Sequence, residues 1–212
     1  RGMERMRGPA NFSSNEEWGL LVDGFHEGPK VMMTYNPSSY SRYLEEFGCV
    51  RAKDLVAYWL DTSQVPERYL AVAENLEKAA PVTIRRIDLK RFPAEVEKVR
   101  TVYNAAWEKN WGFVPMTPEE IDHMARELRP VVDPDFVIFA EAAGKTVGFA
   151  LCLPDVNRAL KVANGRLWPW GLIRMLVEMK KVKEVRVLTL GVLEEHRRRG
   201  IDVLMYLHLW RT

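Results

Sequence analysis

The clearest pattern of apolar and polar positions lies in residues 185–210, near the carboxyl end of the sequence. Residues 185–193 read VRVLTLGVL, an apolar and β-branched run with the length and composition of a buried strand. A polar turn, EEHRRRG, follows and ends at Gly200. Beyond it the apolar positions recur at helical spacing, at Ile201, Leu204, Met205, Leu207 and Leu209. The pattern therefore predicts a strand, a basic turn and a helix in succession.

The preceding hundred residues show the same two periodicities. The sequence predicts a first strand at 82–87, a helix that begins near Pro93, and a second helix that begins at Thr117 and has acids in its first turn. A hairpin with strands at 136–140 and 147–153 is expected next, and then helical stretches at 157–165 and 172–180, separated by Trp168-Pro169-Trp170-Gly171. The order of elements from residue 82 is thus strand, helix, helix, strand, strand, helical insert, strand, turn, helix.

The first 81 residues are less regular. Strands are expected at 31–35 and 49–61, with a helix between them that ends near Gly48. Residues 62–81 read as a linker that contains an amphipathic helix and is stopped by Pro81.

The turn that ends at Gly200 has the composition of an anion site. The start of a helix leaves backbone N–H groups without intrahelical partners, and glycine lets a ligand approach the backbone closely. Arg197, Arg198 and Arg199 add charge-assisted contacts suited to phosphate. Neither the Walker A pattern nor the three-glycine dinucleotide pattern fits. The alternative, a solvated basic turn between two core elements, stays open.

These residues resemble the acyl-CoA motif of the GNAT (Gcn5-related) N-acetyltransferases. In that family a central strand leads into a turn Arg/Gln-x-x-Gly-x-Gly/Ala that opens a helix, and Leu190, Val192, Arg197 and Gly200 fall on the matching places. Glu194 stands where proline is common, and Asp202 stands where Gly or Ala is usual. The resemblance implies an α/β (α+β) GNAT-like acyl-CoA N-acyltransferase fold with a mixed, mainly antiparallel sheet flanked by helices, incomplete at both ends.

The resemblance also implies a domain organisation. Residues 1–61 resemble the closing portion of a first GNAT-like unit, 62–81 form a linker helix, and 82–212 form the amino-terminal portion of a second GNAT domain that includes the acyl-CoA motif. The tyrosine that protonates the departing thiolate in many members falls on Leu44 here, one residue from Tyr43. Leu44 cannot donate a proton, and Tyr43 reads better as a packing aromatic.

An acyl-CoA, acetyl-CoA or another, is the co-substrate that the resemblance implies. Pantetheine would run along the strand and pyrophosphate over the turn, where the carboxylate of Asp202 either competes with phosphate for N–H groups or caps its own helix. The implied cofactor-binding residues are Leu190, Gly191, Val192, Arg197, Arg198, Arg199, Gly200, Ile201 and Asp202.

The catalytic residues are not identified by any pattern. Glu141 and Glu194 are candidate general bases, with Glu184 a further one, because a carboxylate with a suitable pKa can take a proton from an ammonium substrate. The expected function is an acyl-CoA-dependent N-acyltransferase, an N-acetyltransferase for preference, in which an amine attacks directly within a ternary complex. A non-catalytic GNAT-like scaffold or CoA-binding module is the alternative.

Composition restricts the partners. The 212 residues carry a net charge of +2, too balanced for a broad nucleic-acid footprint. Two isolated cysteines and four histidines show no metal-ligand spacing, so no metal is expected. No apolar run reaches the length of a membrane span, so a cytoplasmic protein without a membrane partner is expected. The acceptor is expected to be a small-molecule or peptide amine, and a homodimer is left open.

Overall fold

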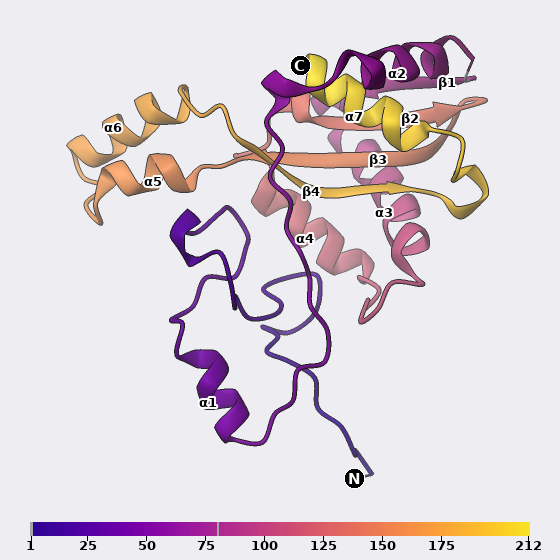
Figure 1. Ribbon diagram of the computed structural model, residues 1–212. Helices are drawn as coiled ribbons and strands as arrows, with labels where there is room; N and C mark the ends of the chain where they lie inside the picture. The colour runs from indigo at the N-terminus through magenta and orange to yellow at the C-terminus, as the bar shows by residue number, and fades with distance from the viewer. Residues whose placement is uncertain (1, 80) are drawn as a thin grey trace. The chain divides into compact units, whose positions relative to one another are not determined.

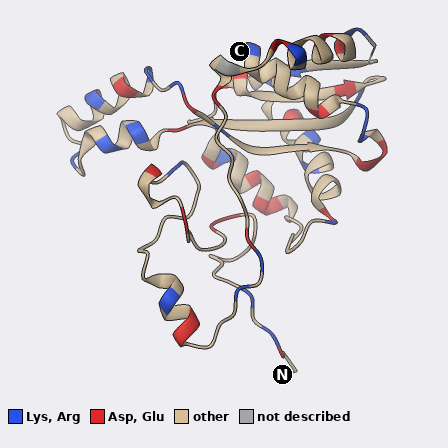
Figure 2. Ribbon diagram, viewed as in Figure 1, with Lys and Arg blue, Asp and Glu red and all other residues tan. Residues whose placement is uncertain are grey.

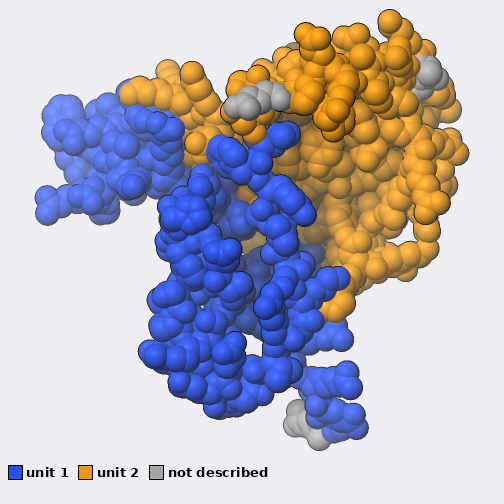
Figure 3. Space-filling model, in the orientation of Figure 1, with its two compact units in different colours: residues 1–60, 156–179 blue, residues 61–155, 180–212 orange. Residues whose placement is uncertain are grey.

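The computed structural model describes residues 2–79 and 81–212 (Figure 1). The chain divides into two compact units, coloured separately in Figure 3. Unit 1 comprises residues 1–60 and 156–179, and unit 2 comprises residues 61–155 and 180–212. Each unit is described by itself.

Unit 2 is built on a four-stranded antiparallel sheet in the order β1-β2-β3-β4. Its strands are β1 (Val82–Arg86), β2 (Val137–Ala142), β3 (Lys145–Pro154) and β4 (Val185–Val192). The β2–β3 hairpin turns at Ala143 and Gly144, both with positive φ (48° and 76°), which is the backbone of a tight two-residue turn. The predicted fold class, a mixed and mainly antiparallel sheet flanked by helices, is confirmed, and the four described strands are all antiparallel.

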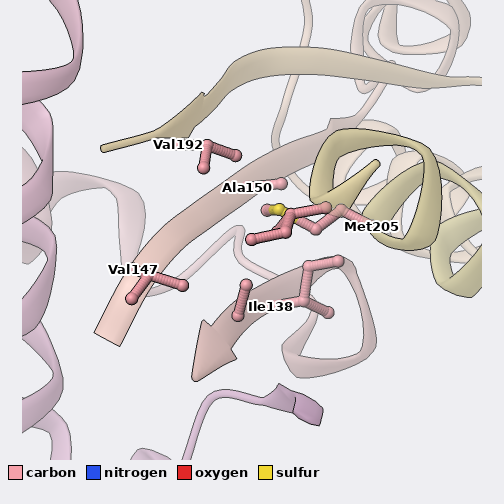
Figure 4. Packing of buried hydrophobic residues seen from close by; sticks show 7 residues of the cluster. Ile138, Val147, Ala150, Val192 and Met205 are labelled. Atoms are coloured by element: carbon pink, nitrogen blue, oxygen red, sulfur yellow. The ribbon is translucent and has the colours of Figure 1, made fainter. Parts of the chain in front are cut away.

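One face of the sheet is covered by α7 (Ile201–Arg211). Because side chains alternate along a strand, Ile138 and Ala140 of β2 point to this face, where they meet Ile201 and Met205 of the helix (Figure 4). Met205 is fully buried. The predicted apolar spacing of this helix is thus the spacing of its buried side.

The opposite face is covered by α3 (Phe92–Trp107). Phe139 of β2 and Phe149 of β3 are both buried here against Val102 and Ala106 of the helix. α4 (Pro118–Leu128) begins with a full capping box between Thr117 and Glu120 and packs beside α3.

The helix of the predicted linker forms as α2 (Glu67–Ala79) and packs beside α7. Arg211 of α7 pairs with Glu77 of α2 at 3.1 Å, and the Trp210 Nε1–H donates to the Thr62 carbonyl oxygen at 3.0 Å. These contacts bring α2 to the same side of the sheet as α7.

Unit 1 contains three α-helices in the described part of the chain: α1 (Tyr40–Glu46), α5 (Asn157–Ala163) and α6 (Trp170–Met179). The two helices predicted between residues 157 and 180 are confirmed. The strands predicted at 31–35 and 49–61 are wrong, since both stretches are irregular. Neither stretch pairs its backbone with a described strand, and in the second stretch Tyr58 and Trp59 are 90% and 67% exposed. Among the described residues, no helix combines the length and the apolar character needed to cross a bilayer.

Candidate functional site

The predicted strand, turn and helix form a continuous unit at the end of β4. The strand ends at Val192, and a short 3-10 turn covers Glu194–His196. The backbone then takes the left-handed conformation at Arg198 (φ 61°) and again at Gly200 (φ 74°), which is the N-cap of α7. Two left-handed residues within three positions turn the chain sharply from the sheet into the helix.

The amino end of α7 presents backbone donors. The first bond of the helix runs from the Leu204 N–H to the Gly200 carbonyl oxygen at 3.0 Å, so the N–H groups of Ile201, Asp202 and Val203 have no intrahelical acceptor. Gly200 supplies no side-chain cap. The Ile201 side chain is buried in the core, whereas that of Asp202 is exposed. The core therefore fixes the helix start, and its first N–H groups are free of intrahelical acceptors.

Arg197 holds the turn in place through its side chain. Its Nε–H donates to the Val192 carbonyl oxygen at 3.0 Å, and its Nη2 donates to the Ala106 carbonyl oxygen at the end of α3. The guanidinium thus ties β4 to α3. Its role in any anion site is to shape the turn, and the exposed side chains of Arg198 and Arg199 are the cations available to a ligand.

Glu194 is a second anchor of the turn. Both of its carboxylate oxygens lie 2.6–2.7 Å from Lys109 Nζ, in the segment after α3. This hydrogen bond and the charge of Lys109 lower the pKa of Glu194 below its ordinary value. The Glu194 carboxylate is therefore held against the end of the same helix that Arg197 contacts.

A cavity of about 210 Å³ lies beside the turn within unit 2. Its lining is largely apolar, with His196 and Arg199 as the polar contributors. Leu76 of α2 reaches the turn itself, since a Cβ at Gly200 would lie 2.8 Å from its Cδ1. The full lining consists of Leu76, Pro81, Val82, Ala142, His196, Arg199 and Ile201.

The strand residues of the predicted site place their side chains in the core. Val192 is buried and Leu190 packs against the same α7-side cluster. Gly191 is buried where a Cβ would lie 2.3 Å from the Trp107 ring, so only glycine fits between this strand and α3. Among the described strands β4 is the last in the sheet order, so its outer backbone edge pairs with no other described strand.

Two of the three candidate bases, Glu141 and Glu194, are held by cations. Glu141 on β2 accepts from Arg85 Nε at 2.9 Å, and Lys98 lies 3.4 Å away. Hydrogen bonding from Arg85 is the main cause that lowers the pKa of Glu141. Glu194 is lowered by Lys109, as described above. A lowered pKa stabilises the carboxylate and weakens it as a proton acceptor, so neither group is tuned as a general base in this structure.

Lys109 and Leu76 shape the site from outside the motif, and Arg197 within the motif has an anchoring role that the motif does not predict. The side chains of Arg197 and Lys109 act through contacts with α3, which is distant in the chain, and a pattern of residues cannot show such contacts. Leu76 lies on a helix that reads as a linker. Its amphipathic spacing was the available signal, because an apolar stripe requires a partner surface.

Comparison with known proteins gives two similar curated sequences. No protein-family model matches the chain. A bacterial ceramide synthase from Caulobacter vibrioides is 37% identical over 197 residues, 91% of this chain and 50% of that protein. Protein YghO from Escherichia coli is 32% identical over 204 residues, 93% of this chain and 51% of that protein. The chain therefore spans about half the length of these relatives.

Solved structures similar to the chain are N-acetyltransferases. A GCN5-related N-acetyltransferase from Sphaerobacter thermophilus has a TM-score of 0.38 and 18% identity, over 62% of this chain and 32% of that one. Ard1 from Thermoplasma volcanium has a TM-score of 0.36 and 19% identity, over 62% of this chain and 65% of that one.

Proposed function

We propose that this chain carries the acyl-CoA-binding part of a GNAT-type N-acyltransferase. The observation that supports this most directly is the start of α7, where N–H groups without intrahelical acceptors, a left-handed glycine and the exposed Arg198 and Arg199 follow the last strand of the described sheet. Pyrophosphate is the group that such donors suit, and the outer edge of β4 is the place for the amide groups of pantetheine.

The reaction proposed is direct transfer of an acyl group to an amine. The neutral amine attacks the thioester carbonyl carbon, a C–N bond forms, and the C–S bond breaks as the CoA thiolate leaves. The amine nitrogen loses one proton and the thiolate gains one, so the products are an amide and free CoA. A fixed pyrophosphate orients the thioester relative to the acceptor, which is the contribution expected of the turn.

The name of the relative from Caulobacter vibrioides suggests the chemical class of the acceptor amine. That protein is a ceramide synthase, and a ceramide is the amide of a fatty acid with a long-chain amino alcohol. We extend the proposal for this chain to a long-chain amino alcohol as acceptor and a long-chain acyl-CoA as donor, with acetyl-CoA and a short amine as the competing pair. Release of free CoA thiol, measured with each donor and acceptor in turn, separates the two.

CoA binding by the turn is tested most sharply at Asp202, because its side chain is exposed while its N–H points out of the helix start. Asp202→Pro removes both the carboxylate and the N–H, whereas Asp202→Ala removes only the carboxylate. Proline is already accepted at the second position of a helix in this protein, as Pro93 in α3 shows. The two variants therefore differ mainly by one donor.

Isothermal titration with CoA gives the readout. Loss of one hydrogen bond to a charged phosphate corresponds to roughly 1.5–3 kcal/mol, or about 10–100-fold in Kd between the Pro and Ala variants. Asp202→Ala is expected to bind at least as tightly as the parent, since a competing anion is gone. Equal affinity of the two variants, each checked for intact helix content by circular dichroism, would contradict the assignment of the turn.

A second candidate function is a CoA-binding scaffold without catalysis. The observation that favours it is the engagement of both Glu141 and Glu194 by cations, which leaves neither tuned to accept a proton. CoA binding that is sensitive to Asp202→Pro, together with no release of thiol for any donor and acceptor pair, would favour this alternative over the enzyme.

A further inference from the structure

The helices α5 and α6 form a hairpin that is inserted in the sequence between β3 and β4 (Figure 1). We call residues 156–179 the insert hairpin. α5 buries its small residues Ala159 and Ala163, whereas no residue of α6 is buried. The link between the helices is tight, since a Cβ at Gly171 would lie 1.6 Å from the Arg166 carbonyl oxygen. The hairpin is thus a defined structure with one largely uncovered helix.

The exposed side of α6 is its apolar side. At 100° per residue, the five exposed apolar residues of the helix occupy a single arc of about 160°. The half-buried residues Gly171, Met175, Glu178 and Met179 fill the opposite arc. This is the reverse of an ordinary surface helix, whose apolar stripe faces the core. The exposed apolar residues are Trp170, Leu172, Ile173, Leu176 and Val177.

Large aromatic side chains stand at the tip of the insert hairpin. Trp168 is 86% exposed and Trp170 is 69% exposed, and Leu167 beside them is exposed as well. Tryptophan combines an apolar ring with a polar N–H, and it is enriched where a protein meets the interface between water and lipid. The tip therefore continues the apolar arc of α6 with the residue type typical of that interface.

The insert hairpin and the segment that follows it in the sequence are rich in basic residues. Residues 156–183, the hairpin and the segment that follows it, contain seven Lys or Arg residues and one acid, Glu178, which gives a net charge of +6. The whole chain carries +2, so the other residues together carry −4. Figure 2 shows lysine and arginine on both helices of the hairpin. The seven cations are Arg158, Lys161, Arg166, Arg174, Lys180, Lys181 and Lys183.

We propose that the insert hairpin binds the surface of a membrane that contains anionic lipid. The exposed arc of α6 and the indole rings of Trp168 and Trp170 enter the boundary between headgroups and acyl chains, and the basic residues contact lipid phosphates. The charge favours this occupant over a second copy of the chain, because two hairpins of like charge repel each other. α6 is too short to span a bilayer, so it lies in the interface.

This inference goes beyond the proposed acyl transfer and replaces the expectation of no membrane partner. It rests on the exposed arc and the charge of the hairpin, and it does not depend on CoA binding. An apolar helix is usually part of a core, but the apolar residues of α6 are the exposed ones.

The test is flotation of the 212-residue chain with lipid vesicles. Vesicles with equal parts of phosphatidylglycerol and phosphatidylcholine should bind the protein at least about tenfold more strongly than pure phosphatidylcholine, and added salt should weaken the binding. Trp168→Ala combined with Trp170→Ala should lower the partition coefficient about tenfold or more, because two indole rings lose their burial. Trp59→Ala, with a similar exposure of 67%, is the matched control.

The contribution of charge to vesicle binding is tested by a second variant and its matched control. Lys161→Glu combined with Arg174→Glu should lower binding to anionic vesicles at least about tenfold, whereas Lys90→Glu combined with Arg91→Glu changes the net charge equally but lies outside the hairpin. Equal losses in the two pairs, equal losses in the tryptophan variant and its control, or no binding to anionic vesicles would overturn the proposal. It would also be overturned by dimerisation in sedimentation velocity that is abolished by the tryptophan variant without vesicle binding by the parent.

Discussion

The β3–β4 framework and the insert hairpin between its strands are both rich in apolar residues, but they use them in opposite ways. In the framework, Phe149 is buried against α3 and Met205 is buried between α7 and the sheet. In the hairpin, Trp168, Trp170 and Ile173 are more than half exposed. Apolar content therefore predicts that a segment needs a partner surface. It does not tell whether that surface belongs to the same chain. The contrast is tested most strongly by substitutions in each region and their effects on the free energy of unfolding.

The largest difference is expected between Phe149→Ala and Trp170→Ala. Phe149 is 1% exposed, and removal of a buried phenyl ring should lower the free energy of unfolding by about 3–5 kcal/mol. Trp170 is 69% exposed, so its loss should change that free energy by no more than about 0.5 kcal/mol. Urea unfolding followed by circular dichroism measures both. A loss of more than 2 kcal/mol in Trp170→Ala (roughly the cost of a buried side chain) would mean that α6 is covered by protein.

The next effect concerns ion pairs. The Glu95 side chain is 3% exposed and accepts from Arg85 at 2.6 Å and from Lys98 at 3.1 Å. Arg85→Met should cost about 3 kcal/mol, because it removes the main partner of a buried carboxylate. In the hairpin, Arg158 lies 4.0 Å from Glu178 and is largely exposed, so Arg158→Met should cost at most about 1 kcal/mol. Urea unfolding measures both losses of stability. Similar losses in Arg85→Met and Arg158→Met would contradict the difference between the buried and the exposed ion pair.

The same buried carboxylate predicts a pH dependence. Burial by itself raises the pKa of Glu95, but hydrogen bonds from Arg85 and Lys98 outweigh it, and the pKa lies below its ordinary value of 4.5. An acid with a lowered pKa stabilises the fold above its unfolded pKa, and this contribution is lost as the pH falls through the folded value. Thermal unfolding between pH 7 and pH 3 should therefore show a steeper loss of Tm below about pH 4.5 for the parent than for Glu95→Gln.

The fold was predictable from the sequence where local pattern and tertiary contact agree. The β2–β3 hairpin, the capped start of α4 and the strand–turn–helix at Gly200 all carry local signals, and the structure has them. The stretch at 49–61 carries the composition of a strand, but it forms none, because a strand requires a neighbour that composition does not specify. Gly200 made the backbone turn of the candidate site predictable from the sequence. The side-chain contacts that hold the turn in place were not predictable. Arg197 reads as a ligand cation, whereas its side chain bonds two backbone carbonyl groups of distant elements.

That anchoring role predicts an intermediate effect. Arg197→Ala leaves the carbonyl groups of Val192 and Ala106 without this partner and should cost about 1–3 kcal/mol. Arg199→Ala removes an exposed cation from the same turn and should change stability by no more than about 0.5 kcal/mol. Urea unfolding of the two variants side by side checks the difference. If Arg199→Ala costs as much as Arg197→Ala, the hydrogen bonds of Arg197 do not stabilise the turn.

The smallest predicted effect concerns two residues with a left-handed backbone, one in the turn before α7 and one in the insert hairpin. Arg198 in the turn has φ 61°, and Asn164 at the end of α5 has φ 45°. The left-handed conformation costs an ordinary residue about 1–2 kcal/mol, whereas asparagine adopts it more readily. Glycine removes that cost, but it makes the unfolded chain more flexible, which lowers the free energy of unfolding by about 0.5–1 kcal/mol. Arg198→Gly should therefore stabilise the protein by about 0.5 kcal/mol, and Asn164→Gly should be neutral or slightly destabilising. Differential scanning calorimetry of the two variants gives the sign. Destabilisation by Arg198→Gly would show that the arginine side chain makes a favourable contact in the turn that outweighs the strain.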